Sequence, residues 1–389
     1  MNDDKIYRSI WNRAKNIDST RDLSVELIQN WLNEKSADYK SVKRRQIGTF
    51  TKIDCIVIEL NDSKGCIPLV DYKDDIKWKS NNEARQQRSE IWSKAEWFEP
   101  LWIPQGRVNE ILSDVKKHPE STMHERLNYH LSTTYTIPFL CVCVAQLMPK
   151  CSAFDDFIEI INESFICSFS GYKNSSLASL IPIVEGVLTR LLEGQPQSQL
   201  TLPARVDRAI DKAIDLAADI YYEEMWTPRE YRDSSYLIAL DERVYIFETF
   251  RSWMKEVFFS NTENYTGQSW LNRHAYAHAL NNNWQQLSSF SLLIVALTTL
   301  GVIDSWGNRK SGITLFFEDM DSKGEKLLNE VMFTINMTLI KQEVQEKSDN
   351  TSLGGPEIFS KDWNFFIFIS SFCLTLFMKL SSRKNKNTQ

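Results

Sequence analysis

The feature that most constrains the fold is a long succession of helix-length segments in which apolar residues recur every three or four positions. It runs from about residue 106 to residue 347, and its breaks at 194–203, 227–235 and 260–268 are rich in turn-forming residues. Helices are expected near 106–118, 123–148, 153–169, 175–194, 204–225, 236–259, 269–281, 284–302 and 323–347. The pattern therefore predicts a mainly α protein.

The first 80 residues have a different pattern. Two amphipathic helices are expected within the first 35 residues, and three segments with alternating, β-branched sequences follow them: GTFTKIDCIVIEL, GCIPLVDY and DIKWK. These segments predict a small antiparallel sheet at 48–79. We therefore expect an α+β domain of unknown role at 1–150, a helical domain at 151–347 and a polar linker at 348–361.

Composition sets the broad class of protein. The chain has 389 residues, 42% of them hydrophobic and 25% charged, which is enough for a core without disulfides. A net charge of −6 argues against non-specific coating of nucleic acid, because phosphate binding depends on clustered Lys and Arg, but it leaves room for a local basic patch. Seven cysteines without a Cys-x-x-Cys pair, and the lack of a secretory signal, predict reduced thiols and a cytoplasmic location.

One hydrophobic segment, 362–380, stands apart near the end of the chain and is followed by a basic tail at 381–389. From Trp363 to Leu380 it is about 18 residues long, which is the lower limit for a membrane-spanning helix. We interpret 363–380 as a candidate contact with the inner membrane, and a buried terminal helix or an oligomer contact are the alternatives. The basic tail favours the cytosolic side, which suits a simple tail anchor poorly.

The stretch SWLNRHAYAHALNNN at 269–283 holds two of the five histidines of the chain. Ser269 is the predicted N-cap of its helix, so that Arg273 and His274 fall within the first turn or so. The free backbone N–H groups at such a helix start are suited to holding a phosphate. His274 and His278 are four residues apart and share a helix face, and the long Arg273 side chain can reach the same opening.

The string Arg273-His274-Ala-Tyr-Ala-His278 resembles the motif of HEPN-domain ribonucleases, in which an Arg, a polar residue and a His lie near the start of a late helix. The longer string LNRHA, which includes Asn272, and an upstream apolar helix with the lone acid Glu185 extend the likeness. Ala279 departs from the pattern, because a Gly is usual there.

The resemblance covers about 150–345 and implies an all-α HEPN-like bundle, with a smaller N-terminal α+β portion outside it. It also implies a homodimer in which two copies of the motif face each other across a two-fold axis. The role that it implies is in a bacterial toxin or antiphage defence system, with an antitoxin or another regulatory protein as a further partner.

The activity that the resemblance implies is metal-independent endoribonuclease activity on an RNA substrate, without a cofactor. The RNA 2′-hydroxyl must lose a proton and attack phosphorus, and the 5′-oxygen must gain one. His278 is then the general acid and base, Arg273 binds the scissile phosphate, and His274 orients or supplements them. Glu185 can hold Arg273 or a histidine in place, and Tyr276 can stack on a base.

Other interpretations of the same residues stay open. The stretch can be a partly exposed helix whose polar residues cap or pair locally, in a catalytically silent helical scaffold that dimerises there and attaches to a membrane through 363–380. His274 and His278 also have the spacing of two zinc ligands, but Ala275 stands where a zinc protease needs a glutamate. A separate group, His118, His124 and His130, lies in a polar helix start and is expected to be solvated.

Overall fold

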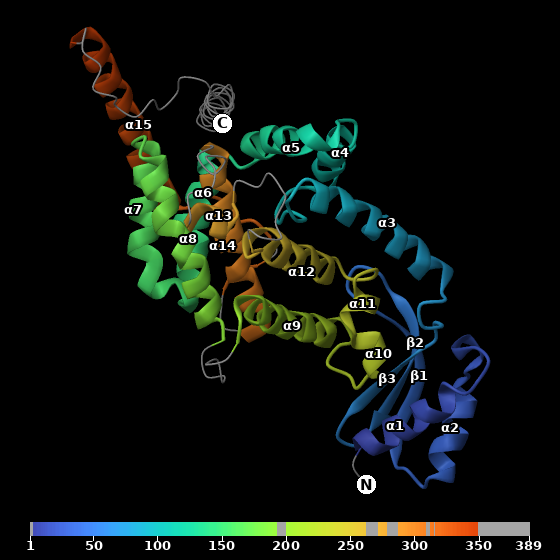
Figure 1. Cartoon of the computed structure of the whole chain (residues 1–389). Coiled ribbons are helices and arrows are strands. Elements are labelled where there is room, and N and C mark those ends of the chain that lie inside the picture. The colour runs from blue at the N-terminus through green and yellow to red at the C-terminus, as the bar shows by residue number, and fades with distance from the viewer. Residues whose placement is uncertain are drawn as a thin grey trace, which may run out of the picture. The chain divides into compact units, whose positions relative to one another are not determined.

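The computed structural model describes residues 3–192, 200–261, 271–277, 287–308, 312–314 and 316–348 (Figure 1). The protein is mainly α, as the sequence predicts. The chain divides into two compact units, unit 1 with residues 1–92 and 210–251, and unit 2 with residues 93–209 and 252–389. The divisions fall within the helices α3, α9 and α12, whose bounds are given below.

The domain boundary expected at residue 150 coincides with none of the three divisions and falls inside unit 2. The reason is that α6 (Ile137–Val142) and the turn after it pack against α14 (Leu287–Asn308) and α15 (Ser322–Ser348). The chain on both sides of residue 150 therefore contributes to one core.

Unit 1 combines a small sheet with helices from both of its chain segments. The N-terminal segment contains α1 (Asp3–Ala14), the 3-10 turn Thr20–Asp22, α2 (Val25–Glu34), β1 (Tyr39–Ile47), β2 (Ile53–Leu60), β3 (Lys64–Pro68) and α3 (Ile76–Lys94). The later segment contains α9 (Leu202–Tyr221), α10 (Arg229–Arg232), α11 (Ser234–Leu237) and α12 (Glu242–Trp253). The strands form an antiparallel sheet in the order β1-β2-β3.

The sheet is antiparallel as predicted, but its extent differs from the predicted 48–79. β1 lies before that range, with a polar sequence in which only Val42 and Ile47 are buried, so its pattern carries no strand signal. The segment 75–79 was predicted as a strand. Residues 76–79 are instead the first residues of α3, a polar helix that was not predicted.

A buried ion pair fixes the loop between β1 and β2 to the helical part of unit 1. Asp241 accepts hydrogen bonds from the backbone N–H of Arg243 at 2.9 Å, from Nε of Arg243 at 2.8 Å and from the hydroxyl of Thr49 at 3.1 Å. Nη2 of Arg243 donates to the same carboxylate and, at 3.1 Å, to Thr49 Oγ1. Every charged group of the pair therefore has partners, as burial requires.

All regular secondary structure among the described residues of unit 2 is helical. Its first chain segment contains α4 (Gln105–Val115), α5 (Glu120–Thr134), α6, the π-helical turn Cys143–Leu147, the 3-10 turns Met148–Lys150 and Ser152–Phe157, α7 (Ile158–Phe169) and α8 (Lys173–Arg190). Its second contains the π-helical turn Met254–Phe258, α13 (Arg273–Ala277), α14 and α15. The single helix expected at 123–148 is broken at Tyr135, where the chain bends by 72°.

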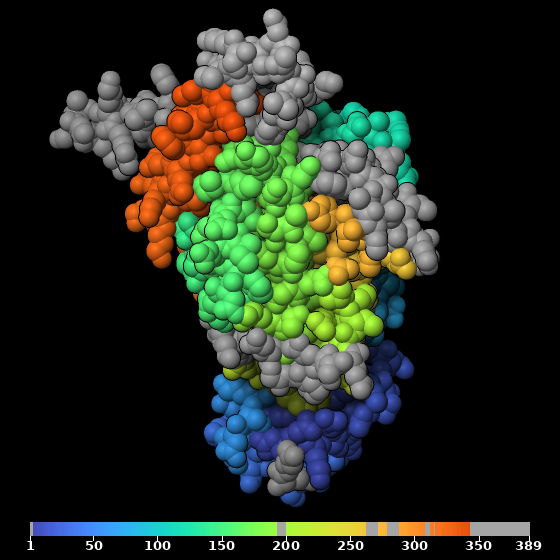
Figure 2. Space-filling model, turned by 60° about the vertical axis from the view of Figure 1, so that its left-hand side comes forward, coloured from blue at the N-terminus to red at the C-terminus, as the bar shows by residue number. Residues whose placement is uncertain are grey.

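The core of unit 2 surrounds α14, which packs against α5, α6 and α8. Helix α7 packs against both α8 and α15, and their surfaces adjoin in the space-filling view (Figure 2). Among the described residues, α14 is long and apolar enough to cross a membrane, but 78% of its apolar window is buried inside the protein, as in the core helix of a soluble protein. The predicted membrane segment 362–380, the tail and the linker after Ser348 lie outside the described residues.

Candidate functional site

Asn272 starts α13 and attaches it to the preceding helix. Its side-chain Oδ1 accepts a hydrogen bond from the backbone N–H of Ala275 at 2.8 Å, which is an N-cap interaction. Its Nδ2 donates to the backbone carbonyls of Val257 at 2.7 Å and Ser260 at 3.0 Å. The N-cap expected at Ser269 is thus Asn272 in the structure, and the helix begins at Arg273, while Ser269 itself lies outside the described residues.

Arg273, the first residue of α13, forms an ion pair through Nε with Glu185 on α8. The structure therefore brings together two residues that are 88 positions apart in the sequence, and it does so at a partly open position. The side chains of Arg273 and Glu185 keep 29% and 26% of their surface exposed. Within the part of the chain that the structure describes, the ion pair uses Nε of Arg273, and the Nη donors can bind an anion.

Helix α8 holds Glu185 by close packing on its other sides. It packs against α7 and α14, and the residue after Glu185 is Gly186. A Cβ at Gly186 would lie 2.5 Å from the ring of Phe157, so only glycine allows this close approach. The position of Glu185 is therefore fixed by packing of the helix and not by the ion pair alone.

A second arginine, Arg205 on α9, contacts α8 one helical turn after Glu185. The Thr189 hydroxyl donates to the backbone carbonyl of Glu185 at 2.8 Å, and Nη1 of Arg205 donates to the same hydroxyl at 2.8 Å. Arg205 is partly exposed. The sequence analysis missed it, because no spacing in the sequence relates 205 to 185 or 273.

The other residues predicted for the site lie on α13 or outside the described residues. His274 and Tyr276 are partly buried on α13, and burial raises the pKa of the Tyr276 phenol. Ala275, between them, points into the core. His278 lies outside the described residues, so the structure tests no geometry between it and Arg273.

Two histidines expected to be solvated are buried instead. His124 and His130 both lie on the inner side of α5 with Met123, Leu127 and Leu131, at helical spacing that could have revealed it. The prediction that these histidines are solvated is wrong, because it rested on the polar composition of the segment and not on its periodicity.

His130 belongs to a small network of charged residues. Its Nε2 lies 2.8 Å from Oδ2 of Asp114, which also pairs with Arg126. Burial lowers the pKa of His130, and hydrogen bonds from His130 and Arg126 hold the pKa of Asp114 at about 2. The neutral imidazole can thus donate from Nε2 to the carboxylate.

The described residues contain no group of three or more His, Cys, Asp or Glu side chains placed to hold a metal ion. His278, the second histidine of the zinc alternative, lies outside these residues.

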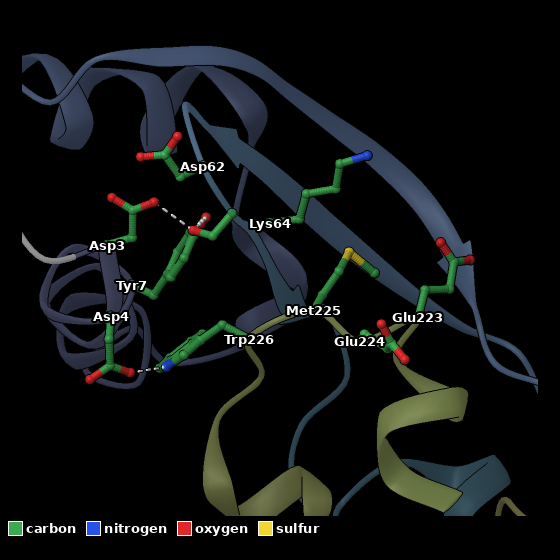
Figure 3. A pocket seen from close by; sticks show the side chains of 10 residues that line it. Asp3, Asp4, Tyr7, Asp62, Lys64, Glu223, Glu224, Met225 and Trp226 are labelled. Atoms are coloured by element: carbon green, nitrogen blue, oxygen red, sulfur yellow. Dashed lines mark hydrogen bonds between the residues drawn. The ribbon is translucent and has the colours of Figure 1, made fainter. Parts of the chain in front are cut away.

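Unit 1 contains a cavity of about 530 Å³ beside the start of α1 (Figure 3). Tyr7 and Trp226 stack there with ring centroids 5.4 Å apart, and Trp226 Nε1 donates to Asp4 at 2.7 Å. The charged lining residues are Asp3, Asp4, Asp62, Lys64, Glu223 and Glu224. Five carboxylates against one ammonium group repel phosphate, so this cavity is unsuited to RNA.

Comparison with protein-family models, with curated proteins and with solved structures finds no match to this chain.

Proposed function

We propose that the protein is a metal-independent endoribonuclease of the HEPN type, with its site at the start of α13. The observation that carries the proposal is the partly exposed ion pair between Arg273 and Glu185. The positive charge of this pair is partly exposed and belongs to the first residue of the string that resembles the HEPN motif, on a helix start fixed by Asn272. A fixed guanidinium near the reacting phosphate supplies the electrostatic stabilisation that RNA cleavage requires.

Each residue has a role in this proposal. Arg273 binds the scissile phosphate through its Nη donors, and Glu185 orients it through Nε. His278 transfers the protons, His274 orients or supplements Arg273 and His278, and Tyr276 stacks on a base. Arg205, near Glu185, adds a second positive charge for the RNA backbone.

Two copies of the chain complete the proposed site. One copy supplies one Arg and one proposed proton-transferring His, whereas 2′-hydroxyl attack needs one proton removed and another delivered. A homodimer related by a two-fold axis would supply a pair of each. We further propose that this activity serves a cytoplasmic toxin or antiphage defence system under the control of a partner protein.

The alternative is a catalytically silent helical scaffold. The same ion pair favours it in one respect, because an arginine already paired with a carboxylate is partly neutralised. In a scaffold the pair only joins α13 to α8. The two functions therefore differ in whether Arg273 is needed for chemistry or for packing.

The test is cleavage of end-labelled total tRNA and mRNA in EDTA by the wild type and by Arg273→Ala and His278→Ala. We expect fragments with 2′,3′-cyclic phosphate ends from the wild type and a rate about 10²–10³-fold lower for Arg273→Ala. Arg190→Ala is the matched control, because Arg190 lies on the same helix as Glu185 and, like Arg273, pairs with a carboxylate, that of Asp156. Cleavage by both site variants at the wild-type rate would exclude this site, and intact RNA with all proteins would favour the scaffold.

A further inference from the structure

Helix α15 has an apolar stripe on a side that no described residue covers. Phe333, Met337 and Ile340 follow each other at helical spacing, so they lie on one side of the helix. Their exposed fractions are 66%, 49% and 54%. Val331 and Ile335, on another side, are buried against the rest of unit 2. The helix is therefore apolar on two sides, and the exposed stripe needs a partner.

The sequence after α15 contains an apolar segment that needs cover as well. Beyond Ser348 the chain is mostly polar up to Asp362, with Leu353, Ile358 and Phe359 as its large apolar residues. From Trp363 to Leu380 only Asn364 and Lys379 are strongly polar. Such a segment is stable against lipid or against an apolar protein surface, because water penalises its exposure.

The linker has the right length to bring the two together. From Ser348 back along α15, Ile340 is about 12 Å and Phe333 about 22 Å away at 1.5 Å per residue. Between Ser348 and Trp363 the sequence has 14 residues, and a flexible coil of that length would have a root-mean-square span of roughly 19–22 Å. A linker whose span matches the distance between two sites gives an effective concentration in the millimolar range, on the order of a thousand times that of a second copy at micromolar protein.

We propose that residues 363–380 dock on the stripe formed by Phe333, Met337 and Ile340 of the same chain. The basic tail agrees with this occupant better than with a membrane. Arg383, Lys384 and Lys386 follow the segment directly, and a tail anchor would have to move these charges across the bilayer. The segment is also at the lower limit of length for a span. Docking within the chain removes apolar side chains of both the stripe and the segment from water, and it does not require the charged tail to cross a bilayer.

The chain contains a natural probe for this contact, because Cys373 lies in the middle of the segment. The experiment introduces Met337→Cys into the full-length chain and oxidises it mildly at low micromolar concentration. Five of the described cysteines, Cys55, Cys66, Cys141, Cys143 and Cys151, are buried and do not compete. Cys167 on α7 is partly exposed, so every variant also carries Cys167→Ser. We expect a disulfide between the introduced thiol and Cys373 within one chain, identified by mass spectrometry of the monomer.

The matched control is Glu325→Cys, which is also exposed on α15 but lies about 120° round the helix and roughly 18 Å along it. We expect at least about a ten-fold lower yield there, and Ile340→Cys should repeat the result for Met337→Cys. Disulfide-linked dimers would show that a second copy covers the stripe, and flotation with phosphatidylethanolamine and phosphatidylglycerol vesicles without the disulfide would show membrane insertion. Either result, or a yield equal to the control, would overturn the proposal.

Discussion

The two units each contain an arginine paired with a carboxylate, and the two pairs differ in every respect that decides their use. In unit 1, Arg243 and Asp241 are 4% and 0% exposed, and Thr49 shares hydrogen bonds with both. In unit 2, Arg273 and Glu185 are 29% and 26% exposed and are joined by one ion-pair contact, from Nε to the carboxylate. The first pair is a closed structural element, whereas the second has donors and surface left over.

Exposure distinguishes a charged pair that only stabilises the fold from one that can bind a ligand. A buried pair must satisfy all of its donors and acceptors inside the protein, so no capacity remains for a ligand. A half-open pair gains little stability, because solvent screens it, but its arginine can exchange one anion for another. We therefore expect the first pair to control the free energy of unfolding and the second to control RNA binding.

The largest effect should follow from Asp241→Ala. The substitution leaves the Arg243 guanidinium buried without its carboxylate, and we expect the free energy of unfolding to fall by about 3–5 kcal/mol in urea denaturation. The control is Arg8→Ala, which breaks an exposed pair with Asp4 in α1 and should change it by about 0.5 kcal/mol or less. Equal effects of the two variants would contradict the comparison.

The next effect concerns the helix start that carries Arg273. Asn272→Asp keeps the size of the side chain and its N-cap oxygen, but it replaces a donor to two carbonyls by a carboxylate oxygen. We expect a loss of about 1–3 kcal/mol in urea denaturation. Cleavage should fall as well, because α13 no longer holds Arg273 in place. Wild-type stability of this variant would mean that the two hydrogen bonds to Val257 and Ser260 contribute nothing.

The fold was predictable where the hydrophobic pattern is strong. Helix α14 and helix α8 follow directly from the spacing of their apolar residues. The polar elements β1 and α3 were missed, because each buries only two residues and pairing or packing partners determine their conformation. The division of the chain into two units could not be read from the sequence for a related reason, because contacts of α6 with α14 join segments that are distant in the sequence.

The sequence names the residues of the candidate site but does not give their arrangement. Sequence analysis considered Glu185 as a partner for Arg273 or for a histidine, and the structure pairs it with Arg273. Asn272 also attaches α13 to the residues before it, through hydrogen bonds to the carbonyls of Val257 and Ser260, and no local sequence pattern reveals these partners. His130 could have been assigned to the core, because its neighbours on α5 have helical periodicity.

A third pair, Asp114 with His130, contains a histidine, so its contribution to the free energy of unfolding should depend on pH. Burial lowers the pKa of His130 and of His124 in the folded protein, so the unfolded chain binds more protons as the pH falls below about 6.5. We expect the melting temperature to decrease from pH 7.5 to pH 5.5, and the decrease to be smaller in a His124→Gln and His130→Gln double variant. A melting temperature that rises on acidification would show that Asp114 outweighs burial and raises the pKa of His130.

The smallest effect on stability should come from Glu185→Gln. The amide keeps an oxygen that can accept from Nε of Arg273 but removes the charge that competes with phosphate, so we expect less than about 1 kcal/mol of change in the free energy of unfolding. Affinity for RNA should increase by about two- to five-fold at low salt, an effect that also stays below about 1 kcal/mol and vanishes at high salt. Fluorescence anisotropy with a labelled RNA measures it, and Asp156→Asn, which removes the partner of Arg190 on the same helix, is the control. A large loss of stability would place Glu185 with Asp241 as a structural carboxylate, and unchanged affinity would mean that Arg273 binds no phosphate.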